Sequence, residues 1–504
     1  MNKQLHPHLA YDDDETADSY IRRLAQFHTG RDGPSLLADL GITQGDFSTG
    51  ADGALSKLSE TTGISPLRLK AGWIRRVARY RELRGDPCSI DFIRPEGAFV
   101  CPECLQEDAM EGRIWLVKGQ LSWRLRPVQC CARHHSRLVE PSFLHNDGEP
   151  ASVFTSLSRI AQLKAEPQVP TALELSVVAR LSGRPSDAGE WLDSQTLEQG
   201  VKACEMIGAT LLHGLTFSHR ALSSEDWREA GAYGFGIARE GVKAVMEALS
   251  RIADMSTTTA GQAGPKAVYG RLYEWLAYTS PVPEFGPIRG LLRENILNTI
   301  VIEPDAVLLG ERVESRRLHS VYSLSIKTGL HLQRLRKILV RSGLADEDSW
   351  ELAAHRLVFP VEEAEQLCRD IIDSVSLHQL PEAIGCSRTQ AGSLYREKVI
   401  SPMIEADASL GIGMLAFSRR DLESFLDQID RLPFLHTSNP DQVDLTKAAK
   451  MTGRSTGYIV SRILSGNLKA YRVGSVAAVN GIRFVASNLD HIRSRKPPVI
   501  AGQQ

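Results

Sequence analysis

The chain has 504 residues, a formal net charge of −2, and a composition that is 42% hydrophobic and 24% charged. These values are typical of a globular protein with several hydrophobic cores, and the length corresponds to roughly three to four domains of ordinary size. The near-neutral charge excludes a protein that binds nucleic acid over its whole surface, so any DNA-binding surface must be local.

At the N-terminus, residues 1–95 are predicted to form a helical region. An apolar stripe at helical spacing is expected to be buried there: Trp73, Ile74, Val77 and Tyr80. The first 15 residues are polar and acidic, without the basic and apolar segments of a secretory signal. Nowhere does an apolar stretch approach the ~18 residues needed to cross a bilayer. We therefore expect a cytoplasmic protein that does not enter membranes.

Cysteine residues are concentrated in the next segment, residues 96–145, which is predicted to be a zinc finger. Cys101 and Cys104 form a C-x-x-C pair, and Cys131 and His134 form a C-x-x-H pair after 26 intervening residues. Two such pairs supply the four ligands of a tetrahedral zinc site, and a reducing cytoplasm favours metal binding over disulfides. The sequence therefore predicts one Zn²⁺ as cofactor, with a set of buried structural cysteines as the alternative.

The neighbouring residues leave the ligand set open, because Cys130 or His135 could replace a member of it. Cys130 points away from Cys131 if the chain is extended there, and this favours Cys131 together with His134. Cys88 is predicted to be a core residue.

A catalytic zinc is the main alternative to a structural one. Zinc deaminases carry an H-x-E element upstream of P-C-x-x-C, but here Val100 precedes Cys101 and no H-x-E lies upstream. Four protein ligands also leave no coordination position for a water molecule. The chain has neither a Walker A loop nor an H-E-x-x-H helix. We therefore expect a structural metal and a protein that is not an enzyme.

The pattern C-P-x-C-L-x-E-D from Cys101, followed by Trp123 and by V-x-x-C-x-x-H-x-x-x-L from Val128, resembles the zinc-finger signature of the TniQ/TnsD family of transposition proteins. The stretch S-x-x-x-R-L-A from Ser19 is similar to the opening helix of that family. The resemblance covers about residues 10–145. Ala132 and His135 depart from it, standing where the family usually has Pro and Gly. The second cysteine pair of some relatives is also absent between residues 137 and 150.

This resemblance implies a non-catalytic factor that selects the target site for a mobile element. Such a factor binds DNA or a targeting complex, and it recruits the transposon AAA+ ATPase and the transposase. In CRISPR-associated elements the targeting complex is a guide-RNA effector complex, and a homodimer is compatible with this role. The alternative function is a zinc-containing helix-turn-helix transcription regulator, which would act without a transposase.

Amphipathic patterns from Leu192 to Leu212 and from Trp227 to Ile252 predict a helical middle domain at residues 146–300, with a linker near 256–270. At four places in the chain an apolar residue stands eight positions before a glycine, as the end of one helix and the turn to the next would require. The four pairs are Leu55–Gly63, Val321–Gly329, Leu377–Gly385 and Leu445–Gly453.

The last three pairs predict helix-turn-helix units at residues 301–365, 366–436 and 437–492. Strands beginning at Lys469 and Gly481 would add a wing to the last unit, and residues 493–504 are expected to be a disordered tail. The first pair is expected to be a packing or protein-contact module beside the finger.

Basic residues without neighbouring acids accompany these units and suit contacts with DNA phosphates. The alternative is that such runs are merely solvated helix faces. The candidate DNA-contacting residues are Arg334, Arg336, Lys337, Arg341, Arg388, Gln390, Arg454, Arg462, Lys469 and Arg472. The predicted fold class is therefore a mainly α, multidomain protein, with an N-terminal helical and zinc-finger region and several C-terminal helix-turn-helix units.

Overall fold

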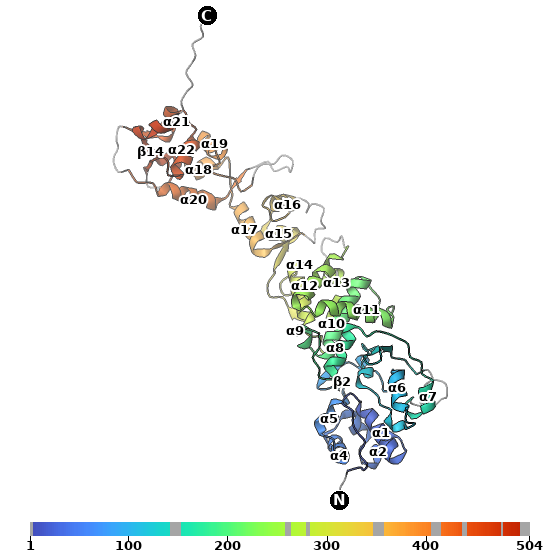
Figure 1. The fold of residues 1–504 in the computed structure, drawn as a ribbon. Helices are drawn as coiled ribbons and strands as arrows, with labels where there is room; N and C mark the ends of the chain where they lie inside the picture. Colours follow the sequence, from blue (N-terminus) through green and yellow to red (C-terminus); the bar gives the residue numbers. More distant parts are fainter. Residues whose placement is uncertain are drawn as a thin grey trace. The chain divides into compact units, whose positions relative to one another are not determined.

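The structure is a computed structural model that describes residues 4–141, 153–257, 264–278, 283–345, 357–404, 415–435, 441–474 and 477–493. Helices predominate, and the strands form small sheets of two or three strands, which confirms the mainly α fold class (Figure 1). In the described part of the chain, no helix combines the length and the apolarity needed to cross a membrane.

Two compact units make up the chain. Unit 1 comprises residues 1–258, 263–298 and 305–313, and unit 2 comprises residues 259–262, 299–304 and 314–504. Unit 1 thus combines the N-terminal region, the finger and the middle helices. The finer division into seven segments stays a prediction.

Unit 1 begins with five short helices around an apolar core that includes Tyr20, Leu24 and Leu58. The helices are α1 (Ala17–Thr29), α2 (Gly33–Asp39), α3 (Gln44–Thr49), α4 (Asp52–Thr62) and α5 (Pro66–Ala71). Gly63 ends α4 in the left-handed conformation, and the hydroxyl of Ser65 accepts a hydrogen bond from the first turn of α5. The first predicted glycine corner is therefore present.

The predicted helical stripe from Trp73 to Tyr80 is wrong. An antiparallel sheet occupies this stretch: β1 (Ile74–Val77), β2 (Tyr80–Leu83) and β3 (Asp86–Cys88). Ile74 pairs with Leu83 and Val77 pairs with Tyr80, so a hairpin satisfies these backbone groups. Over so few residues a helical spacing also fits a hairpin, and the β-branched and aromatic side chains favour the strand. Only Trp73 of the stripe is fully buried.

The finger and the middle helices complete unit 1. Their elements are α6 (Pro102–Ala109), β4 (Cys130–Cys131), β5 (Ser136–Arg137), α7 (Leu157–Ala161), α8 (Ala172–Leu181), α9 (Glu190–Asp193), α10 (Leu197–His213), α11 (Ser224–Ala238), α12 (Val242–Asp254), α13 (Pro265–Tyr278), α14 (Ile288–Thr299), β6 (Val307–Leu308) and β7 (Glu311–Arg312). The single run predicted from Trp227 to Ile252 is two helices, separated at Gly241, whose φ is 92°. The predicted linker lies partly outside the described residues, and α13 already begins within its C-terminal half.

Polar contacts join the finger to the middle helices. Arg126 donates two hydrogen bonds to the carboxylate of Glu205, at 2.8 and 2.6 Å, and Glu205 is buried. The backbone N–H of Gln129 donates to buried Glu174 at 2.8 Å, and Arg228 lies 3.3 Å from the same carboxylate. Because buried carboxylates are costly without partners, these contacts hold the finger against α8 and α10.

Unit 2 repeats one structural plan. A short strand leads into a helix, a glycine corner joins this helix to a second one, and a returning strand leads into a last helix. The first repeat contains β8 (Leu318–Ser320), α15 (Val321–Thr328), α16 (Leu332–Arg341), β9 (Val358–Pro360) and α17 (Val361–Ile372). The second contains β10 (Val375–Ser376), α18 (Leu380–Ala383), α19 (Arg388–Arg396), β11 (Ala416–Phe417) and α20 (Arg419–Asp430). The third contains β12 (Gln442–Asp444), α21 (Leu445–Thr452), α22 (Thr456–Leu464), β13 (Tyr471–Arg472), β14 (Ile482–Val485) and the 3-10 helix η8 (Ala486–Ile492).

The strands of each repeat pair antiparallel, β8 with β9, β10 with β11 and β12 with β14. The three corner glycines, Gly329, Gly385 and Gly453, have φ values of 74°, 60° and 66°. Ahead of Gly385 the predicted two-turn helix is shortened, because β10 extends to Ser376 and α18 begins only at Leu380. The two strands predicted after the second helix of the third repeat are present, since β13 pairs with β14, and their role as a wing stays a prediction. The predicted tail lies almost wholly outside the described residues.

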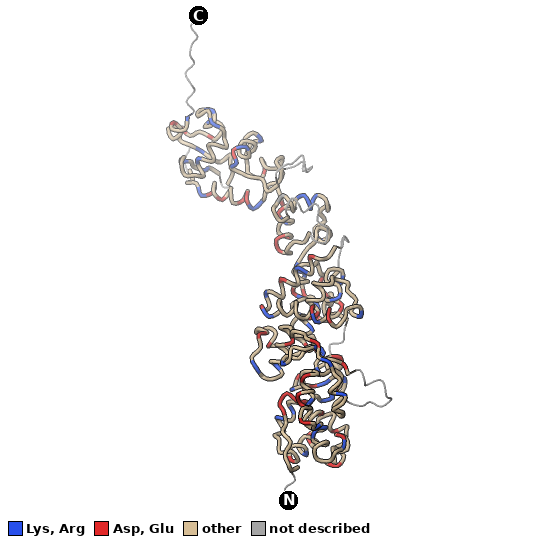
Figure 2. The backbone as a smooth tube through the Cα atoms, turned by 45° about the vertical axis from the view of Figure 1, so that its right-hand side comes forward, with Lys and Arg blue, Asp and Glu red and all other residues tan. Residues whose placement is uncertain are grey.

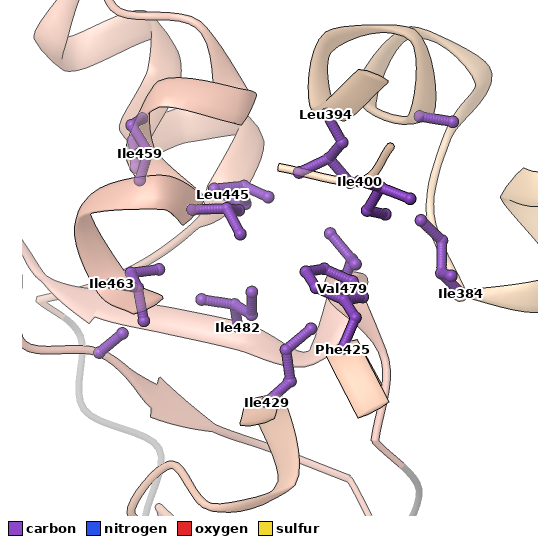
Figure 3. Close-up of a cluster of buried hydrophobic side chains, with 14 of the residues drawn as sticks. Ile384, Leu394, Ile400, Phe425, Ile429, Leu445, Ile459, Ile463, Val479 and Ile482 are labelled. Atoms are coloured by element: carbon purple, nitrogen blue, oxygen red, sulfur yellow. The ribbon is translucent and has the colours of Figure 1, made fainter. Parts of the chain in front are cut away.

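One apolar core serves both the second and the third repeat. Leu394 and Ile400 of the second repeat belong to the same buried cluster as Leu445, Ile459 and Ile482 of the third. Figure 3 shows side chains from both repeats pointing into this shared interior. These two repeats therefore form one folded body rather than two independent domains.

Candidate metal centre and DNA-contacting surface

The predicted ligands come from two local structures. Cys101 is the N-cap of α6, and its Sγ accepts a hydrogen bond from the backbone N–H of Cys104 at 3.5 Å. Pro102 occupies the first helical position, which suits its fixed φ. The hairpin of β4 and β5 supplies Cys131 and, in its turn, His134. A helix N-terminus and a hairpin thus present one pair of ligands each.

The structure brings all four predicted ligands together. Their ligand atoms lie within 4.8 Å of one another, and the three cysteines are buried. The Sγ atoms of Cys104 and Cys131 are 3.7 Å apart, and His134 Nδ1 lies 3.2 Å from Sγ of Cys104 and 3.5 Å from Sγ of Cys101. A tetrahedral zinc with Zn–S bonds of about 2.3 Å places its sulfurs about 3.8 Å apart. The cluster therefore fits Zn²⁺.

Glu107 orients the histidine of the cluster. Its Oε1 lies 3.0 Å from His134 Nε2, and its Oε2 is 2.6 Å from Nη2 of Arg133. A carboxylate on the outer nitrogen fixes the tautomer of a metal-bound histidine and leaves the other nitrogen for the metal. Sequence reasoning missed this role, although Glu107 is the E of the C-P-x-C-L-x-E-D pattern. The adjacent Asp108 accepts a hydrogen bond from the backbone N–H of Lys118 at 3.0 Å.

The competing residues lie outside the cluster. Cys130 points the other way along β4, and its thiol donates to the backbone oxygen of Gln168 at 2.6 Å. Burial raises the pKa of Cys130 to about 12, so this thiol stays protonated. His135 is exposed and has a φ of 52°, a left-handed conformation that glycine adopts most readily. Cys88 is buried in β3, as predicted for a core residue.

Among the predicted DNA-contacting residues, those of α16 form a basic helix. The helix contains no acidic residue. Figure 2 marks in blue the lysine and arginine positions of the whole chain. Arg334 is exposed, whereas Arg336 and Lys337 are half-buried. Arg341 ends the helix, and its side chain lies outside the described residues.

In the second repeat the two candidates differ. Arg388 is exposed at the first position of α19. Gln390, by contrast, is only 5% exposed. Its Oε1 accepts a hydrogen bond from the backbone N–H of Ser387 at 2.8 Å, and its Nε2 donates to Thr446 Oγ1 at 3.4 Å. The side chain of Gln390 therefore caps α19 and is not presented to a DNA base, which corrects that expectation.

The third repeat offers mixed candidates. Arg454 and Lys469 are exposed, and Arg462 is half-buried. Arg454 also packs over the ring of Tyr458, with 5.0 Å between the guanidinium carbon and the ring centre. Arg472 lies 3.5 Å from Asp430 and packs over an aromatic ring, so its side chain joins the wing to α20.

Comparison with known proteins identifies the N-terminal part of the chain. No curated protein matches the chain. Residues 6–138 match the profile of the TniQ family. The match includes all four residues of the Cys₃His cluster and stops before the middle helices and unit 2. The chain thus carries a TniQ domain, as the resemblance of its finger to the TniQ/TnsD family predicted.

Proposed function

We propose that the protein is a non-catalytic factor that selects the target site of a mobile element. In this proposal unit 2 binds DNA, and the TniQ domain binds the AAA+ ATPase and the transposase of the element. The observation that carries the proposal is the TniQ match at residues 6–138, because it relates the chain to transposition and includes a complete Cys₃His cluster.

A structural zinc supports the non-catalytic role. The four residues around the cluster fill a tetrahedral shell, so that no position remains for a substrate or a water molecule. Zinc would link α6 to the hairpin of β4 and β5, and would fix the surface around them. The chain's own residues would therefore present a rigid surface to a protein partner.

Direct DNA binding is supported by the repeated plan of unit 2. Each repeat contains two helices joined at a glycine corner, which is the layout of a helix-turn-helix. The basic helix α16 provides exposed Arg334 for phosphate contacts. The near-neutral net charge of the whole chain limits nonspecific binding to DNA. These features favour recognition of a DNA site over recognition of a guide-RNA complex.

The first test is metal analysis of the purified full-length protein together with selection from a pool of random DNA duplexes at moderate salt. We expect one zinc per chain and an enriched sequence motif. Zinc without an enriched motif would overturn the DNA-reading part and point to a protein or ribonucleoprotein target. A protein that folds without zinc would overturn the structural role of the metal.

The alternative, a zinc-containing transcription regulator, is separated from target selection by a second experiment. The element's transposase and ATPase are supplied in cells with and without this protein, and the insertion sites are mapped. We expect insertions to concentrate near the selected motif only when the protein is present. An unchanged insertion map, together with altered transcription near the motif, would favour the regulator.

A further inference from the structure

The second helices of the second and third repeats pack directly against each other. The backbone N–H of Gly457, in the first turn of α22, donates to Ser393 Oγ of α19 at 2.9 Å. A Cβ atom at Gly457 would lie 2.5 Å from the backbone oxygen of Ser393, so only glycine allows this approach. The hydroxyl of Ser455, which caps α22, donates to Oε1 of Glu397 at 2.8 Å.

This packing obstructs the end of α22 that a helix-turn-helix presents to DNA. Residues at the start of the second helix contact the base edges in the major groove. In α22 this start abuts the C-terminal half of α19, and Gly457 is buried. Glu397 also places a carboxylate at the helix N-terminus, where a DNA phosphate would otherwise be favoured.

The starts of the other two second helices are open to solvent. Ser387, Arg388 and Thr389 at the start of α19 are exposed, and so are Gln333 and Arg334 near the start of α16. In α22 the capping Ser455 is exposed as well, but the first helical residues differ: Thr456 is half-buried and Gly457 is buried. The first turns of α16 and α19 therefore keep the positions that read bases available, whereas the first turn of α22 does not.

A groove connects α16 with the second repeat. It has a volume of about 580 Å³, and His331, Arg334 and Lys337 line it from the side of α16. Gln379 lines it from the second repeat, and the adjacent His378 lies 3.4 Å from Arg388 through Nε2. Basic and hydrogen-bonding side chains thus run from α16 to the start of α19.

We infer that DNA bases are read by α16 and by the first turn of α19, and that α22 supports α19 without reading bases. This inference rests on the proposed function and makes it more specific. The partner is double-stranded DNA, with Arg334 and Arg388 as the specificity-determining residues. The role of the third repeat is then structural, because α22 holds α19 in place.

The test compares Arg334→Ala, Arg388→Ala and Arg454→Ala in the full-length protein. Arg454 is the comparison residue, because it is an exposed arginine at the corner of the third repeat, to which the inference assigns no base contact. Affinity is measured for the duplex selected by the wild-type protein and for the same duplex with single base-pair changes. Thermal unfolding of each variant confirms that the fold is kept.

We expect Arg334→Ala and Arg388→Ala each to weaken binding of the selected duplex roughly tenfold or more, and each to relax the preference at different base pairs. Arg454→Ala should keep the base preference of the wild type, because α22 reads no bases. A lost phosphate contact, or the lost hydrogen bond to the backbone oxygen of Ile492, would weaken the binding of all duplexes alike. A base-specific loss in Arg454→Ala, as large as that of Arg388→Ala, would overturn the inference but leave the proposed function standing. Failure of the wild-type protein to bind any duplex would overturn both.

Discussion

Unit 1 and unit 2 are stabilised by different kinds of interior. Unit 1 buries carboxylates, and each has a partner: Glu15 with Arg23, Glu174 with Arg228, Glu198 with Ser89, and Glu205 with Arg126. In the described part of unit 2, the buried polar residues are hydroxyls, one glutamine and one histidine, His319. The cores of unit 2 are otherwise apolar and follow a repeated plan.

The difference shows how each unit specifies its fold. A buried ion pair is a weak source of net stability, but removing one partner is costly because a charge remains in a poor environment. Unit 1 therefore depends on particular pairs of residues that are distant in sequence, and on its Cys₃His cluster. Unit 2 depends on helix caps, glycine corners and apolar packing, which recur along the sequence.

The largest effect is expected from loss of a zinc ligand in unit 1. Cys101→Ser removes one of the four ligands, and structural zinc contributes apparent folding free energies of about 10–16 kcal/mol in small zinc peptides. We expect loss of zinc and loss of hydrogen-exchange protection from residue 96 to residue 141, with unit 2 unaffected. Cys130→Ser is the matched control, since its side chain lies outside the cluster. If Cys101→Ser kept its zinc and its hydrogen-exchange protection, the fold of unit 1 would not depend on the complete cluster.

The next effect tests the buried ion pairs. Arg23→Ala leaves the fully buried carboxylate of Glu15 without the guanidinium that lies 2.5 Å from it. We expect a loss of about 3–5 kcal/mol in the free energy of unfolding, measured by denaturant titration. Arg31→Ala is the control, because its ion pair with Asp39 is exposed and such pairs contribute under about 1 kcal/mol. Equal losses in both variants would show that unit 1 does not depend on its buried ion pairs more than on its exposed ones.

A smaller effect tests the close packing of unit 2. Gly457→Ala places a methyl group 2.5 Å from the backbone oxygen of Ser393, so α19 and α22 must separate. Such overpacking costs about 1–3 kcal/mol, which thermal unfolding of unit 2 should reveal. Gly392→Ala, on α19, meets no atom within 4 Å and should leave unit 2 as stable as wild type or slightly more so. A neutral Gly457→Ala would contradict the tight contact.

The smallest effect is expected from a change of pH, through His319, the one buried histidine in the described part of unit 2. Burial lowers the pKa of His319, and the positive charge of Arg316 lowers it further. The hydrogen bond to Glu365 acts in the opposite direction and raises this pKa. The folded state therefore binds fewer protons than the unfolded state near pH 6, so stability is present above about pH 6.5 and falls as the pH decreases. We expect the midpoint of unit 2 unfolding to decrease between pH 7.5 and pH 5.5.

The control for this pH effect is a pair of variants. His319→Gln should flatten the pH dependence, whereas His378→Gln, at an exposed site, should keep it. The pKa of Glu365 is lowered by its hydrogen bond with Lys327, so this carboxyl titrates below the range used. An unchanged slope in His319→Gln would assign the pH dependence to another group.

Much of the architecture could be predicted from local patterns. The ligand spacing placed Cys101, Cys104, Cys131 and His134 in one cluster because a tight turn and a hairpin are local structures. The glycine corners of unit 2 were predictable for the same reason. Long-range features were not: no local pattern shows that Arg126 meets Glu205, or that the second and third repeats share a core.

The candidate DNA surface shows the same limit. A position near the start of a helix made Gln390 a candidate, and charge made Arg472 one, but their availability depends on neighbours that are distant in sequence, Thr446 and Asp430. The role of Glu107 was also hidden, although an acidic residue one turn beyond a cysteine ligand is a signal that could have found it. Spacing therefore predicts which residues gather, and tertiary packing decides which of them face solvent.

The shared core of the second and third repeats has a consequence for protein engineering. A chimera that exchanges only one of them would cut through an interior to which both contribute, and would expose apolar side chains such as Leu394 and Ile459. Retargeting such a protein by grafting should therefore transfer residues 373–493 as a single cassette. The basic helix α16 lies outside that cassette, but its Ile338 packs in one buried cluster with Ile404 of the cassette. Only exposed positions of α16, such as Arg334, can therefore be redesigned one at a time.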